Sequence, residues 1–119
     1  MTAAGALVAG GILSGCRGAR PSPIVRTQAG EIQGEITEGI QRFLGVPYAE
    51  PPFGQLRFKP PMPRKRWDGV FVANKYGAIC PQTAPEQPVA LAQGDDCLNL
   101  NIWTPDPGAT GLPVMVWVH

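Results

Sequence analysis

Few side chains in this sequence could catalyse a reaction, and they are scattered along it. Asp95 and Asp96 are adjacent, and paired carboxylates could serve acid–base chemistry or bind a metal ion. No histidine, further carboxylate or thiolate pair accompanies them at ligand spacing, and the one histidine is His119, the last residue. Ser14 and Ser22 are the only serines, and neither has a base partner that could activate it. The residues themselves therefore predict no metal site and no complete catalytic centre.

The composition is that of a globular protein. The chain has 119 residues, of which 44% are hydrophobic and 16% charged, and this balance suits one domain. A net charge of +1 provides no field that could steer an acidic partner. The 15 glycines and 14 prolines indicate many turns and few long helices.

Residues 51–68 are rich in proline and cannot sustain a helix or a central strand. We call this segment the basic loop, because it holds five of the ten basic residues: Arg57, Lys59, Arg64, Lys65 and Arg66. A nucleic-acid interface would need aromatic side chains interleaved with these cations for base stacking. Phe58 and Trp67 are available but isolated, so the pattern indicates a solvated loop and no nucleic-acid partner.

Residues 1–16 form a separate segment. The apolar stretch 6–13 has the length of a signal-peptide core and is shorter than the roughly 20 residues that span a membrane. The sequence Leu-Ser-Gly-Cys at 13–16 resembles a bacterial lipobox, in which Cys16 would receive the lipid. We therefore expect a signal peptide over 1–16, a tether over 17–23, and export to the bacterial cell envelope as a lipoprotein, or to the periplasm or medium.

Two alternatives for this segment remain open. It could be a plain secretory signal with an incidental cysteine, or an apolar start without a signalling role. A signal peptide normally begins with Lys or Arg, and here only the α-amino group precedes the apolar stretch, so the start codon could lie elsewhere than at Met1.

The body of the chain begins near residue 24 with patterns typical of strands. Residues 24–36 alternate apolar and polar side chains around a glycine, which predicts a β-hairpin with Val25 and Ile32 pointing inward. The apolar stretch 40–46 predicts a third strand. The sequence PVMVWVH at 113–119 predicts a buried strand, which needs either a place in a sheet formed by the preceding strands or a longer chain to cover it.

Five segments together resemble the N-terminal part of the type B carboxylesterase family. In order they are RFLGVPYAEPPFGQLRFKPP, WDGV, CPQ, GDDCLNLNIWTP and LPVMVWVH, and the resemblance covers residues 24–119. The most specific of them, residues 95–105, matches a family signature at every position except Asn99, where an aromatic residue or threonine is usual. This departure predicts looser or wetter packing beside the sheet. The resemblance implies an α/β-hydrolase fold, with this chain supplying a small antiparallel layer and the first strands of the central sheet.

The resemblance also implies two pairings. The chain has three cysteines, and assigning Cys16 to the lipobox leaves Cys80 and Cys97 as a pair. In the resembled family a disulfide joins these two positions beside the entrance to the active-site cleft. The alternative is a pair of reduced, buried cysteines. In the family the first acidic residue of the signature, here Asp95, pairs with the arginine that corresponds to Arg57 and ties the basic loop to the strand after the cysteine. The alternative is two surface charges with no fixed partner.

The function implied by the resemblance is hydrolysis of small-molecule carboxylic esters through a serine acyl-enzyme, without a metal or organic cofactor. His119 would begin the oxyanion loop and would not be the general base, and the nucleophile, acid and base would follow later in the chain. We therefore expect an N-terminal fragment that is inactive alone. The alternatives are a non-catalytic, neuroligin-like adhesion protein and an inactive truncated product.

Overall fold

The computed structural model describes residues 22–83 and 92–118. The predicted signal peptide, Cys16 and His119 lie outside the described residues. The elements in chain order are β1 (Ile24–Arg26), β2 (Glu31–Gln33), β3 (Glu35–Thr37), β4 (Ile40–Pro47), the 3₁₀ turn η1 (Gly54–Leu56), β5 (Val70–Val72) and β6 (Asn99–Thr104). None of the described helical segments is long and apolar enough to cross a membrane.

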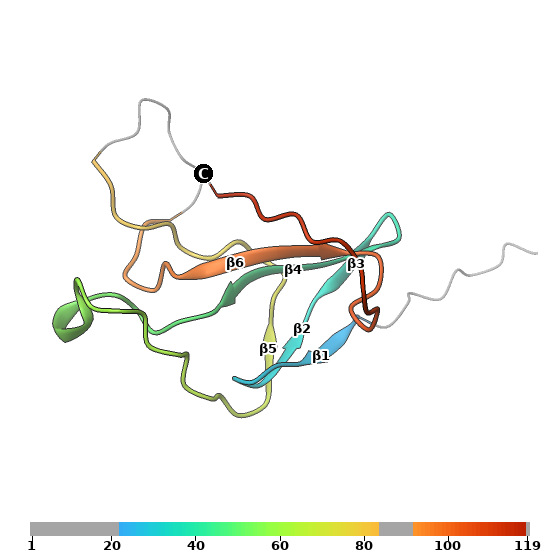
Figure 1. The fold of residues 1–119 in the computed structure, drawn as a ribbon, viewed down its shortest axis with the longest axis horizontal. Helices are drawn as coiled ribbons and strands as arrows, with labels where there is room; N and C mark the ends of the chain where they lie inside the picture. The colour runs from blue at the N-terminus through green and yellow to red at the C-terminus, as the bar shows by residue number, and fades with distance from the viewer. Residues whose placement is uncertain (1–21, 84–91, 119) are drawn as a thin grey trace, which may run out of the picture.

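The first sheet has the strand order β1-β2-β5 (Figure 1). Strands β1 and β2 form the predicted antiparallel hairpin, with Val25 opposite Ile32. Its turn is closed by the backbone N–H of Thr27, which donates to the carbonyl of Gly30 at 2.8 Å. Strand β5 lies parallel to β2 and places Phe71 opposite Ile32. The hairpin prediction is therefore confirmed, whereas the sequence patterns did not indicate β5.

The second sheet has the order β3-β4-β6 and is antiparallel throughout. The predicted third strand is β4, which β6 follows along most of its length (Figure 1). Glu38 and Gly39 turn the chain from β3 into β4 with φ angles of 51° and 83°, as a tight hairpin turn requires. The register between β4 and β6 shifts between Phe43 and Val46, and Gly45 occupies this bulge with a φ of 66°.

The two sheets share one core of Ile32, Phe43, Val46 and Ala73, against which Val25, Trp67 and Phe71 pack. Phe43 retains 2% of its surface and Ala73 none. The N–H of Ala73 donates to the carbonyl of Gln33 at 2.7 Å, and its carbonyl accepts from the N–H of Leu44 at 2.9 Å. Because Gln33 belongs to β2 and Leu44 to β4, Ala73 connects the first sheet to the second.

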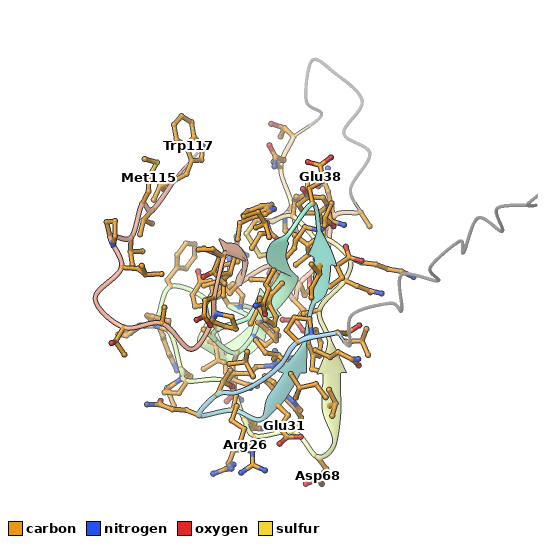
Figure 2. All side chains as sticks on the ribbon, turned by 90° about the vertical axis from the view of Figure 1, so that its right-hand side faces the viewer. Arg26, Glu31, Glu38, Asp68, Met115 and Trp117 are labelled. Carbon is orange, nitrogen blue, oxygen red and sulfur yellow. A yellow bond between two sulfur atoms is a disulfide. The ribbon has the colours of Figure 1, made fainter. Side chains whose placement is uncertain are left out.

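The segment 113–118 departs from the prediction of a buried strand. It forms no strand pairing with any described residue, and the side chains of Met115 and Trp117 are 93% and 84% exposed. Figure 2 shows both side chains on a trace that stands away from the body of the molecule. The physical reason is that a strand needs a neighbour for its backbone N–H and C=O groups, and this segment does not pair with β6, which ends the second sheet, or with any other described strand.

Gly34, between β2 and β3, offers a test of this packing. A Cβ atom at Gly34 would lie 2.5 Å from the carbonyl oxygen of Arg42 and 2.7 Å from the Phe43 ring. We expect Gly34→Ala to lower the free energy of unfolding by about 1–3 kcal/mol through overpacking, measured by urea unfolding. The control Gly108→Ala should change it by less than about 0.5 kcal/mol, because its Cβ would meet only Asp106 Oδ1 at 3.3 Å. Equal stability of the two variants would contradict the packing described here.

Candidate functional site

A disulfide joins Cys80 to Cys97, with the Cα atoms 4.9 Å apart. This separation lies within the usual range for disulfides, and the predicted pairing is confirmed in place of two reduced cysteines. Cys97 is buried and Cys80 is exposed. We call the segment between these two cysteines the disulfide loop. Beside the disulfide, the N–H of Gly94 donates to the carbonyl of Ile79 at 3.1 Å, so a covalent bond and a hydrogen bond both join the two ends of this loop.

The basic loop is tied to the disulfide loop by an ion pair between Arg64 and Asp96. The two guanidinium Nη atoms donate to the two carboxylate oxygens at 3.0 and 2.9 Å. Glu50 adds to this cluster, because its Oε1 lies 3.9 Å from Arg64 Nε and accepts the backbone N–H of Lys65 at 2.8 Å. The bidentate geometry fixes the direction of the loop more than it stabilises the fold.

The predicted Arg57–Asp95 pair is not formed. The guanidinium of Arg57 lies 4.9 Å from the centre of the Phe58 ring instead, and that ring is 93% exposed. The reason lies in the course of the loop. An isolated antiparallel bridge pairs Ala49 with Pro63, and the N–H of Glu50 donates to the carbonyl of Met62 at 2.9 Å, so the chain reaches Arg64 close to Glu50.

Asn99 packs tightly, which corrects the expectation of loose or wet packing. Its Nδ2 donates to the carbonyl of Ala78 at 2.9 Å, and its side chain fills the space in which Gly77 lacks a Cβ. Two residues further along the same face of β6, Asn101 Oδ1 accepts the backbone N–H of Gly45 at 2.9 Å. Asparagine is depleted in strands, so this alternating pair was a sequence signal for side chains that bond to neighbouring backbone.

The described residues do not assemble a catalytic centre. Ser22 is exposed, and residues 22–83 and 92–118 contain no histidine that could serve it as a base. No group of three or more His, Cys, Asp or Glu side chains in this part of the chain could hold a metal ion. What the geometry provides is a framework in which the disulfide loop and the basic loop are fastened to each other and to β4 and β6.

A sequence model of the Carboxylesterase family matches residues 21–119. The chain belongs to this family. The para-nitrobenzyl esterase of Bacillus subtilis is 44% identical over 102 residues, which are 81% of this chain and 20% of that protein. The phenmedipham hydrolase of Pseudarthrobacter oxydans is 42% identical over 104 residues, covering 82% of this chain and 21% of that protein.

Solved structures agree with this family assignment. A structure of a PNB esterase superposes with a TM-score of 0.73 at 42% identity, over 81% of this chain and 21% of that one. These carboxylesterases have the α/β-hydrolase fold, of which the described residues supply only strands, loops and one 3₁₀ turn. The chain spans about a fifth of the length of the curated relatives named here.

Double-mutant cycles can separate the observed ion pair from the predicted one. For Arg64→Ala and Asp96→Ala we expect a coupling free energy of about 1 kcal/mol, because the pair is bidentate but partly exposed. The matched cycle of Arg57→Ala and Asp95→Ala should give additive losses, with a coupling below about 0.3 kcal/mol. Urea unfolding of each variant measures both values. Coupling in the second cycle without coupling in the first would show that the predicted pair is the real one.

Proposed function

We propose that this chain is the N-terminal part of a serine hydrolase that cleaves small-molecule carboxylic esters. The observation that carries the proposal is the family match over residues 21–119, together with 44% identity to a protein named para-nitrobenzyl esterase. The described framework suits this role, because a disulfide and a bidentate ion pair would hold two surface loops rigid beside a cleft completed by later residues.

The chemistry in this proposal is acyl transfer. A serine supplied by sequence after residue 119 attacks the ester carbonyl, a histidine accepts the serine proton, and the alcohol leaves. Water then releases the acid from the acyl-enzyme. In this scheme the segment 113–118 leads to His119, and the oxyanion loop begins there, so that backbone N–H groups stabilise the negative charge on the tetrahedral intermediate.

The test compares this chain with a longer one. The 119-residue chain should not turn over p-nitrophenyl acetate or butyrate above the background of exposed nucleophiles. The longer chain is the same chain extended at its C-terminus to the length of its relatives. It should hydrolyse both esters and lose activity with a serine-directed organophosphonate. Its matched control replaces the serine of a Gly-x-Ser-x-Gly motif by alanine. Saturable turnover by the short chain, or an inert longer chain, would overturn the proposal, and the second result would favour an adhesion role.

We also propose that the protein is exported and anchored to the bacterial envelope through Cys16. The support is the apolar stretch 6–13 followed by the lipobox-like sequence at 13–16, and a disulfide, which suits an oxidising compartment. Expression in a bacterium should give a membrane-associated product that incorporates labelled palmitate. Cys16→Ala should abolish the label, and Ser22→Ala in the tether should leave it unchanged. A soluble product without the added mass of a lipid, from the unaltered chain as well as from both variants, would refute the anchor.

A further inference from the structure

An open cavity of about 400 Å³ lies between the basic loop and the end of β4. Its apolar wall includes Pro51, Trp67 and Phe71, and its rim carries the cations Lys65 and Arg66. The proposed ester chemistry uses none of the residues that line this cavity. Its combination of aromatic wall and cationic rim indicates a ligand with both an apolar and an anionic part.

The aromatic wall is rigid. The indole Nε1 of Trp67 donates to the carbonyl of Glu31 at 3.0 Å, and the backbone N–H of the same residue donates to the carbonyl of Ala29 at 3.0 Å. The ring lies in the space that Gly30 leaves by lacking a Cβ, and its centroid is 5.6 Å from that of Phe71. The surface that a ligand would meet is therefore formed before binding, which lowers the entropic cost of association.

The charge of the cavity is positive because its one acidic lining residue is already engaged. The Glu50 carboxylate accepts the Lys65 backbone N–H at 2.8 Å and lies 3.9 Å from Arg64, which Asp96 also holds. Lys65 and Arg66 are exposed, and no acidic side chain of the described residues lies within 4.0 Å of their charged groups. These two cations remain available to an anion.

We propose that this cavity binds a small organic anion, namely a carboxylate or sulfonate on a planar apolar body. The planar body packs against Pro51 and the rings of Trp67 and Phe71, where it gains apolar burial and ring–ring contact. The anionic group pairs with Lys65 and Arg66, and the guanidinium can bind a carboxylate or sulfonate through two N–H groups. Neither the apolar wall nor the pair of cations would bind such a ligand alone, because the cavity is open to solvent and the cations are exposed.

The experiment follows Trp67 in the longer chain carrying 5-fluorotryptophan, with its ¹⁹F resonance assigned by loss of the signal in Trp67→Phe. The probes are 1-naphthoate, 1-naphthalenesulfonate and the neutral 1-naphthalenemethanol. We expect both anions to shift the Trp67 resonance saturably and to bind more weakly at high salt. The neutral probe should bind at least about tenfold more weakly, the factor that corresponds to losing one charge-assisted contact.

The matched variants remove the same charge from different places. Lys65→Gln with Arg66→Gln should weaken naphthoate binding about tenfold or more, whereas Lys59→Gln with Lys75→Gln, outside this cavity, should leave it unchanged. The other tryptophan resonances should not move in either variant, which establishes that both are folded. Three results would overturn the proposal: no shift of Trp67 with either anion, equal binding of the neutral probe, or equal binding by the two double variants.

Discussion

The fold depends on the backbone of one buried residue. Ala73 has no exposed surface, and its N–H and C=O groups bond to strands of different sheets, to Gln33 on β2 and to Leu44 on β4. An unpaired buried peptide group costs free energy comparable to a lost hydrogen bond, so the loss of either contact would destabilise the fold. They hold the short strands β2 and β5 over Phe43, and the core closes around that ring.

A second group of contacts fastens the loops to this core. The Cys80–Cys97 disulfide is the strongest of them, and chain entropy predicts a stabilisation of roughly 3 kcal/mol for a loop of this length. The Asn99 and Asn101 hydrogen bonds contribute about 1 kcal/mol each. The partly exposed Arg64–Asp96 pair contributes about 1 kcal/mol or less. The disulfide therefore makes the largest single contribution to holding the loop, and the polar contacts fix its direction.

The exposed segment 113–118, in contrast to this framework, leaves its apolar side chains in contact with solvent. Its apolar side chains include Val114, Met115 and Trp117, which are 84–93% exposed. Burying a side chain of this kind is worth about 1.5–3 kcal/mol. A partner strand that covered the segment would therefore gain several kcal/mol, and it would also satisfy the backbone N–H and C=O groups that lack a sheet neighbour here.

The sequence by itself determined the features that are local. Alternation over 24–36 predicted the β1–β2 hairpin and the inward positions of Val25 and Ile32, and the apolar stretch 40–46 predicted β4. Such predictions succeed because a strand places successive side chains on opposite faces, so the alternation of apolar and polar residues shows which face is buried. The family, and with it the disulfide, also followed from motifs in the sequence.

Only the tertiary structure decided the partners of residues far apart in the chain. The parallel pairing of β5 with β2 joins segments separated by the whole of β3, β4 and the basic loop, and no periodicity specifies it. The choice of Arg64 with Asp96 over Arg57 with Asp95 is of the same kind. These two arginines of the basic loop are chemically equivalent in the sequence, and so are the two adjacent aspartates before Cys97. Their ion pairing depends on distances of a few ångström, which only the folded course of the two loops sets.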